Sequence, residues 1–328
     1  MLRAVIDRTF DGWRDRHWFG WLFVPVLLIA AVDAVWLLSS DLTISEGSYF
    51  RIAQVVGMAG AALACSYLCR DIERLRTLFI GAAVMLAAWP SLRLFNHLTM
   101  TIDAPLADSW LAAADLALGF DWKAYVAFAD QKVWLVNGMR LTYGSLTDYT
   151  ALLFLILVCR EGARRRCAEL IRLFLATAIF CMAAGAFFPA VAAMTYYQVP
   201  DGTFQLFSPR TGAYHLDLLL SLRTDPRHVL DLDHLPGLVT FPSFHTAMGV
   251  VGIYCARGSW PLFTVMLAIN LVMIASTPIF GSHYAVDVVA GALVSMVAIA
   301  VDRRMFRPQR QSERRAGAWS PAAVTSPI

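Results

Sequence analysis

The chain is organised as eight stretches of about twenty mostly apolar residues, separated by polar connections. A helix that crosses the hydrocarbon core of a bilayer needs about 20 such residues, so each stretch predicts a transmembrane helix. The pattern therefore predicts an all-α, polytopic helical membrane protein with about eight transmembrane helices. No small-residue cleavage site follows a short apolar core near the N-terminus, so we expect the first stretch to be retained as a span. The predicted helices cover residues 19–39, 49–69, 77–97, 134–159, 168–193, 240–256, 260–281 and 283–302.

The overall composition agrees with this pattern. Of the 328 residues, 58% are hydrophobic and only 16% are charged, and the mean hydropathy is +0.58. Soluble globular domains carry about 25% charged residues. These values exclude a disordered chain, a coiled coil and an ordinary cytosolic enzyme. No basic run with interleaved aromatic residues is present, so we expect no nucleic-acid partner.

Basic residues cluster in alternate connections between the predicted helices. Most of the 27 lysine and arginine residues lie before the first helix, after the second, between the fourth and fifth, between the sixth and seventh, or after the eighth. Cytoplasmic loops of membrane proteins carry an excess of such residues. We therefore expect both termini in the cytoplasm and the long loops 98–133 and 194–239 on the outer side. In a bacterial inner (plasma) membrane these two loops would face the periplasm.

The same features divide the chain into three parts. Residues 1–18 are expected to form a cytoplasmic N-terminal segment, 19–302 a single transmembrane domain, and 303–328 a basic, disordered tail near anionic lipid headgroups. Asp33 in the first predicted helix is expected to pair with Arg51 near the outer end of the second.

Loop 98–133 contains apolar residues that alternate with acids. This alternation favours a short amphipathic helix that lies on the outer membrane surface. The apolar members are Trp110, Leu111, Ala114, Leu116, Leu118 and Phe120, and the acids are Asp108, Asp115 and Asp121.

Two of the seven histidines lie where predicted helices begin on the outer side. His245 follows Pro242 and Ser243 at the start of the sixth helix. Proline suits the first helical turn, and we expect it there. The free backbone N–H groups and the positive end of the helix dipole would then make an anion site beside Ser243 and His245.

The second of these histidines, His283, is followed four residues later by Asp287. Ser282 can cap a helix whose first turn holds His283, and residues four apart share a helix face. A carboxylate at this spacing can accept the Nδ1–H of the ring and leave Nε2 free as a nucleophile or base. An acid just inside a membrane span is also a candidate functional residue. Each motif alone has a structural explanation, but the two together at one membrane face favour catalysis.

These residues resemble the motifs of the type-2 phosphatidic acid phosphatase superfamily. Its second motif is Pro-Ser-any-His, here Pro242, Ser243 and His245, and its third ends in His-any-any-any-Asp, here His283 and Asp287. The longer sequences around the two motifs, Phe-Pro-Ser-Phe-His-Thr-Ala and Gly-Ser-His-Tyr, are most similar to those of the branch that contains inositol-phosphorylceramide synthase. The resemblance covers roughly residues 103–302. It implies a six-helix phosphatase-type core, so residues 19–302 would be a transmembrane catalytic domain.

The resemblance also implies a mechanism. His283, oriented by Asp287, would attack phosphorus to form a phosphohistidine, while His245 would protonate the leaving oxygen. It implies an integral-membrane phosphotransferase or phosphatase that acts on a lipid phosphate or phosphodiester at the outer face. We expect no metal and no cofactor, because no acidic cluster with metal-ligand spacing lies near these histidines.

The sequence departs from the superfamily at its phosphate-binding cations. The third motif usually begins Ser-Arg, where this chain has Ser276 and Thr277, and the Lys-x6-Arg-Pro motif has no clean match. Arg223, in the loop before Pro242, is the nearest substitute for the missing cation, and its alternative role is a solvated loop charge. Arg140 and Arg93 lie inside predicted spans, where an arginine usually faces the protein interior or a polar cavity. Their alternatives are snorkelling or pairing with an acid such as Asp148. The candidate substrate-binding residues are Ser243, Arg223, Arg210, Arg140 and Tyr143, with Arg93 as a further candidate.

The sequence leaves the acceptor open. With water as the acceptor the protein would be a lipid phosphate phosphatase; with a small polyol or a second lipid it would be a phosphotransferase, which the branch resemblance favours. A transporter or scramblase is the alternative of another class. It would place ionisable residues near the membrane midplane in paired repeats. Here the ionisable motifs sit at one face and no repeat is seen.

Overall fold

The computed structural model describes residues 18–208, 210–225 and 227–306. Two expectations from the sequence lie outside these residues. One is the N-terminal segment up to residue 17, and the other is the basic tail from residue 307 onward.

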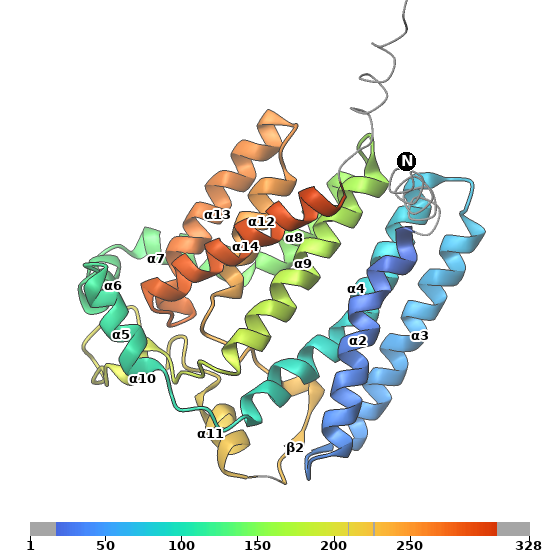
Figure 1. The fold of residues 1–328 in the computed structure, drawn as a ribbon. Helices are drawn as coiled ribbons and strands as arrows, with labels where there is room; N and C mark the ends of the chain where they lie inside the picture. The colour runs from blue at the N-terminus through green and yellow to red at the C-terminus, as the bar shows by residue number, and fades with distance from the viewer. Residues whose placement is uncertain (1–17, 209, 226, 307–328) are drawn as a thin grey trace, which may run out of the picture.

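The regular secondary structure of the described chain is helical apart from two short strands, which confirms the expected all-α, polytopic membrane architecture (Figure 1). The strands β1 (Thr43–Ile44) and β2 (Val229–Leu230) pair in parallel. The helices are α2 (Trp18–Leu38), α3 (Glu46–Leu68), α4 (Glu73–Leu98), α5 (Asp108–Ala117), α6 (Trp122–Asp130), α7 (Val133–Gly144), α8 (Leu146–Val158), α9 (Ala163–Gly185), α10 (Ala193–Tyr196), α11 (Leu216–Thr224), α12 (Phe244–Cys255), α13 (Trp260–Phe280) and α14 (Ala285–Met305).

Fewer helices are long enough to span a membrane than the eight that hydropathy predicts. In the described chain, α2, α3, α4, α9, α13 and α14 qualify. The predicted fourth span is the pair α7 and α8, which bends by 59° at Ser145 and counts as a seventh span only if the pair is taken together. The predicted sixth span shortens to the 12 residues of α12, because residues 240–243 stay non-helical.

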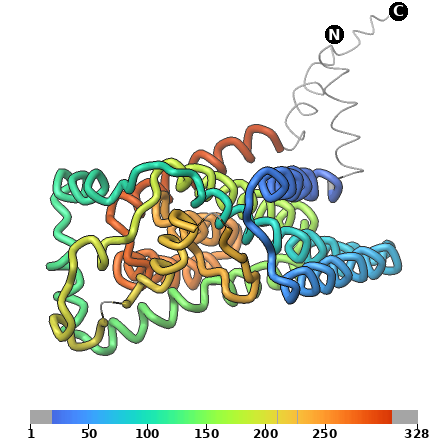
Figure 2. Tube along the Cα trace, turned by 90° about the horizontal axis from the view of Figure 1, so that it is seen from below, coloured from blue at the N-terminus to red at the C-terminus, as the bar shows by residue number. Residues whose placement is uncertain are grey.

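The helices form two groups that share α9. Helices α2, α3 and α4 lie side by side, and α9 packs against α4 on one side and against α12 and α14 on the other (Figures 1 and 2). The junction is apolar: Leu22 and Val26 of α2, Ile80 of α4, and Ala168 and Leu175 of α9 are buried together. The motif-bearing α12 and α14 also pack against each other, and α13 packs against α12 and α7.

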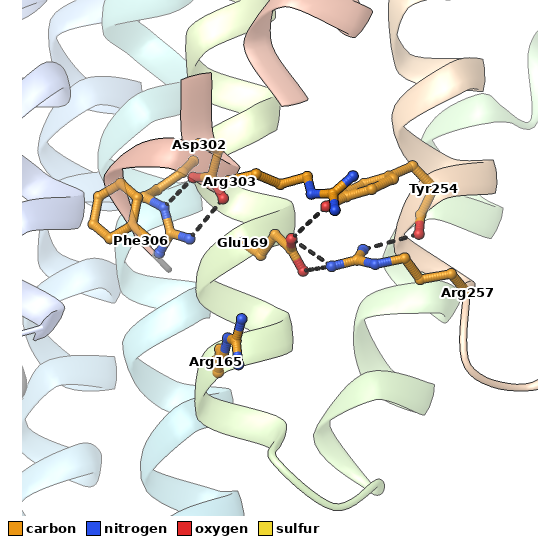
Figure 3. A pocket seen from close by; sticks show the side chains of 8 residues that line it. Arg165, Glu169, Tyr254, Arg257, Asp302, Arg303 and Phe306 are labelled. Carbon is orange, nitrogen blue, oxygen red and sulfur yellow. Dashed lines mark hydrogen bonds and ion pairs between the residues drawn. The ribbon is translucent and has the colours of Figure 1, made fainter. Parts of the chain in front are cut away.

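Two ion pairs hold the ends of α9, α12 and α14 together where the arginine-rich connections lie (Figure 3). Arg172 on α9 binds Asp302 on α14 through two hydrogen bonds of 2.6 and 3.1 Å. Arg257, just after α12, binds both carboxylate oxygens of Glu169 on α9 at 2.6 and 2.7 Å.

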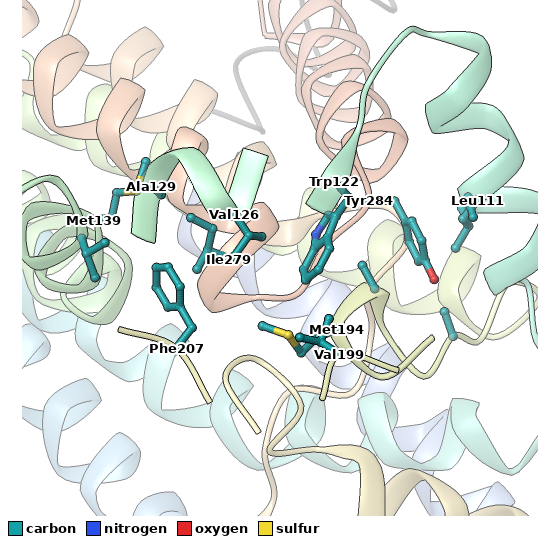
Figure 4. Packing of buried hydrophobic residues seen from close by; sticks show 14 of the residues in the cluster. Leu111, Trp122, Val126, Ala129, Met139, Met194, Val199, Phe207, Ile279 and Tyr284 are labelled. Atoms are coloured by element: carbon teal, nitrogen blue, oxygen red, sulfur yellow. The ribbon is translucent and has the colours of Figure 1, made fainter. Parts of the chain in front are cut away.

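At the other end, the long connections fold over the starts of α12 and α14. Trp122, Met194, Phe207, Ile279 and Tyr284 are members of one buried cluster, which joins α6, α10 and the loop between α13 and α14 (Figure 4). The Trp122 indole donates a 2.9 Å hydrogen bond to the Pro278 carbonyl. This packing fixes the loop that carries His283.

The amphipathic helix expected in loop 98–133 exists, but its polar face points inward. Asp115 on α5 accepts hydrogen bonds from the backbone N–H groups of Ala285 and Val286 at 2.9 and 2.8 Å. Leu116 and Leu118 are instead 71% and 59% exposed. The reason is that the first N–H groups of a helix have no partner within the helix, and Asp115 supplies the acceptor for α14.

The expected ion pair between Asp33 and Arg51 does not form. Arg51 on α3 binds Asp233 through two hydrogen bonds of 3.0 and 3.2 Å, which tie α3 to the loop before α12. Asp33 on α2 is buried, and neither of its carboxylate oxygens has a hydrogen-bond partner among the described residues. The sequence could not anticipate this pairing, because Asp233 is distant along the chain.

Candidate active site

The two histidine motifs meet where the N-terminal ends of α12 and α14 touch. The Ser243 backbone N–H donates a 3.0 Å hydrogen bond to the Asp287 carbonyl. A Cβ atom at Gly291 would overlap the Ser243 carbonyl oxygen, so the two backbones can approach this closely only because residue 291 is glycine.

His283 and Asp287 form the buried pair that their spacing predicts. The distance from His283 Nδ1 to Asp287 Oδ2 is 3.2 Å, and the two side chains are 4% and 0% exposed. The helix starts later than expected, since α14 begins at Ala285 and His283 lies in the preceding loop. The pair still forms because Asp287, in the first turn, also accepts the Tyr284 backbone N–H at 2.9 Å.

Two expected capping positions differ in the structure. Pro242 lies before α12 rather than in its first turn, and Ser243 is the N-cap. Ser282 does not cap α14: it has a positive φ of 51°, and its hydroxyl accepts the Met194 N–H at 2.7 Å. Ser282 therefore attaches the His283 loop to α10.

The other ring nitrogen of His283 faces the start of α12. Its Nε2 lies 3.3 Å from the Ser243 hydroxyl, which in turn accepts hydrogen bonds from the Thr246 N–H and hydroxyl at 3.4 and 3.2 Å. Burial lowers the pKa of His283 to about 4, so the ring is neutral at pH 7. With Nδ1–H directed at Asp287, Nε2 carries the lone pair and accepts the Ser243 O–H. A neutral imidazole with this tautomer can act as a nucleophile.

His245 stands in the first turn of α12 and stacks on Tyr143 from α7. The two ring centres are 4.2 Å apart, and the ring planes differ by 9°. Tyr143 and His283 both lie against Gly281, since a Cβ atom at Gly281 would lie 2.5 Å from His283 Cδ2 and 2.7 Å from the Tyr143 hydroxyl. Both imidazoles therefore lie beside Tyr143, so a molecule bound between the two motifs would meet both of them.

A third histidine, His215, completes the surroundings of His283 and was not singled out from the sequence. It precedes α11 and is buried, and its Nε2 has no hydrogen-bond partner in the part of the chain that the structure describes. Burial and then repulsion from His283 lower the pKa of His215 to about 4. The neighbouring Tyr214 hydroxyl interacts with that of Tyr143. No spacing signal marks these residues, because the loop that carries them reaches the site only in three dimensions.

The site also contains buried polar atoms without partners. Within the described ranges, Thr240 Oγ1, His215 Nε2 and Asp287 Oδ1 have no hydrogen-bond partner. Most buried polar groups in folded proteins are paired, so an unpaired one calls for an explanation such as a bound ligand. These three lie on segments that surround His283.

The candidate phosphate-binding arginines divide into two pairs. Arg223 and Arg93 are engaged by the protein itself. Arg223 donates to the Ala104 carbonyl at 2.7 Å and contacts Asp103, while Arg93 donates to the Leu232 carbonyl at 2.8 Å. Both guanidinium groups therefore hold loops together rather than point to a histidine.

Arg140 and Arg210 are exposed and lie closer to the motif loops. The Arg140 guanidinium is 5.7 Å from the centre of the Phe280 ring, next to the loop that carries His283. Arg210 precedes Gly212, where a Cβ atom would lie 2.7 Å from the Ser282 nitrogen. Neither arginine has an ion pair in the described part of the chain.

A buried His–Asp pair, a second histidine on an adjoining helix end and a membrane-embedded helical bundle define a membrane enzyme site built on histidine. The sequence model of the PAP2 (type-2 phosphatidic acid phosphatase) superfamily matches residues 109–301, and the chain belongs to that superfamily. Comparison with curated proteins and with solved structures found no match.

Membership sets the class of activity. The protein is a membrane PAP2-superfamily phosphatase or phosphotransferase, of a type that needs no metal and acts on phosphate esters. Within residues 18–208, 210–225 and 227–306, no group of three or more histidine, cysteine or acidic side chains has a metal-binding arrangement.

Proposed function

We propose that the protein transfers the phosphoryl group of a lipid phosphate, or the phosphate-containing group of a lipid phosphodiester, through a phosphohistidine at His283. The observation that carries this proposal is the environment of the His283 ring. Its Nδ1 is held by Asp287, and its Nε2 faces Ser243 at the positive end of α12. This arrangement presents a neutral, oriented nucleophile to an anion.

The reaction has two steps. In the first, His283 Nε2 forms a bond to phosphorus, the bond from phosphorus to the leaving oxygen breaks, and His245, which takes up a proton when the substrate anion binds beside it, gives that proton to the leaving oxygen. In the second, an acceptor O–H attacks phosphorus, His245 takes the proton back, and the bond to Nε2 breaks. The α12 N-terminus, with Arg140 and Arg210, would stabilise the charge on the phosphoryl oxygens.

The acceptor decides the product, and we propose transfer to a small polyol or a second lipid, as in inositol-phosphorylceramide synthase. The amino-acid sequences around the two motifs support transfer to such an acceptor. If water is the acceptor, the protein is a lipid phosphate phosphatase that uses the same first step.

A panel of substrates tests the proposed function. Purified protein in detergent would be incubated with phosphatidic acid and with lipid phosphodiesters, in EDTA, with and without inositol, and the products separated. We expect turnover in EDTA, and inositol-dependent lipid products if transfer occurs. Activity that disappears in EDTA and returns with Mg²⁺ or Zn²⁺ would contradict the proposal, as would the absence of any phosphate-ester chemistry. Protein carrying His283→Gln serves as the blank.

We also propose that the histidine motifs face the outside and that both termini are cytoplasmic, which the arginine-rich connections support. Asp201→Cys and Arg164→Cys would be introduced separately into a chain whose native cysteines have been replaced. Both positions are exposed. We expect an impermeant thiol reagent to label residue 201 in intact cells with a permeabilised outer membrane, and residue 164 only after lysis. The reverse labelling pattern would show the opposite orientation.

A further inference from the structure

A cavity of about 310 Å³ lies at the end of the helix bundle opposite the histidine motifs. Figure 3 shows the side chains that line it. It opens between α9, α14 and the segment that follows α12. Arg303, on its wall, is about 24 Å along α14 from Asp287 at about 1.5 Å per residue. The cavity is therefore a separate feature from the candidate active site.

The cavity has more positive charge than its own acids neutralise. Its charged lining consists of Arg165, Arg172, Arg257, Arg303, Glu169 and Asp302. The two acids are already taken, since Asp302 binds Arg172 and Glu169 binds Arg257. Arg165 and Arg303 make no ion pair or hydrogen bond in the part of the chain that the structure describes. Two arginine charges therefore remain for an external anion.

An apolar groove continues from this cavity along the surface of the helix bundle. The groove, of about 460 Å³, runs between α12 and α14 and shares Tyr254 and Arg303 with the cavity. Its other lining residues are Val250, Ile253, Met296, Ile299 and Ala300. A charged pocket joined to an apolar groove is complementary to an amphiphile with an anionic headgroup and a hydrocarbon chain. A free anion would fill only the first part.

We propose that this cavity and groove bind an anionic phospholipid of the leaflet at the arginine-rich end. Arg165 and Arg303 hold the phosphate, and one acyl chain lies along the groove. The lipid connects α9, α12 and α14, which carry or support the histidine motifs at their other ends. The inference does not depend on the proposed reaction.

Lipid binding measured by native mass spectrometry tests the proposal. The full chain in a neutral detergent would be mixed with equal amounts of dioleoyl phosphatidylglycerol and dioleoyl phosphatidylcholine. We expect preferential retention of phosphatidylglycerol. The double variant Arg165→Gln/Arg303→Gln should weaken that retention by roughly tenfold or more, because an arginine near an anionic headgroup contributes about 1 kcal/mol.

The matched control is Arg164→Gln/Arg304→Gln. It removes the same charge from adjacent exposed positions that do not line the cavity. We expect this control to keep the preference. An equal loss in both double variants would overturn the site, because it would show only general attraction between a basic surface and anionic lipid.

Two further experiments distinguish binding of the whole lipid from binding of its headgroup alone. Ala300→Phe should fill the groove and reduce phosphatidylglycerol retention while leaving all four arginines in place. This test does not depend on whether the arginine double variant folds. Soluble glycerol 3-phosphate should compete poorly. Competition as effective as that of the lipid, or unchanged retention in Ala300→Phe, would overturn the acyl-chain part of the proposal.

Discussion

Replacing His283 with alanine is expected to abolish turnover of every substrate, by a factor on the order of 10⁴ or more. The physical reason is that, among the described histidines of the site, only His283 is hydrogen-bonded to a carboxylate. Labelled phosphate from a radioactive substrate should appear on the native protein as an acid-labile, alkali-stable adduct after rapid quenching. No adduct should form on His283→Ala. Both turnover and labelling would be measured.

Two companion variants make this result specific. His234→Ala is the matched control, because His234 is an exposed histidine whose Nδ1 lies 2.8 Å from Asp231, outside the site. It should keep full activity. Asp287→Asn retains the size of the side chain but not the charge that orients the ring, and should lower the rate by several orders of magnitude. Substantial labelling of His283→Ala would contradict the assignment of the nucleophile.

Replacing His245 with alanine is expected to lower turnover of a lipid phosphate by about 10²–10⁴, the usual contribution of a general acid. The loss should largely vanish with para-nitrophenyl phosphate, because its leaving phenolate is stable without a proton. The measurement is the ratio of kcat/KM for the aryl and lipid substrates in the native protein and in His245→Ala. That ratio should rise strongly in the variant.

The control for this experiment is Tyr143→Phe, which preserves the ring that stacks on His245 and removes only its hydroxyl. It should leave the ratio of the two substrates nearly unchanged. Rescue of His283→Ala, rather than His245→Ala, by the aryl substrate would show that the two histidines have the opposite roles. Normal turnover in both alanine variants would rule out catalysis by these residues.

The parts of the fold that were predictable depend on local or periodic signals. Apolar length located the long helices, and a spacing of four residues placed His283 beside Asp287. Both features are properties of a single helix or its edge. Hydropathy extended the sixth span too far because it does not register that Ser243 caps α12 and keeps the preceding residues non-helical.

The parts that were not predictable depend on contacts between distant segments. His215 reaches the site only because Gly212 allows its loop to lie against Ser282. The inward orientation of α5 follows from unpaired N–H groups on α14, which the local alternation of polar and apolar residues does not reveal. Arg223 looked like a free cation in the sequence, but backbone carbonyls after α4 occupy its donors.

The contacts of α5 determine the shortest fragment of this chain that is expected to be active. The superfamily match begins at residue 109, one position after Asp108. Asp108 accepts the Tyr284 hydroxyl at 2.8 Å and the Val191 N–H at 2.9 Å, and so supports the residue next to His283. A fragment cut at the edge of the match would retain His245, His283 and Asp287 but lose this support. The functional unit is therefore longer than the stretch by which relatives are recognised, and truncations should start upstream of α5.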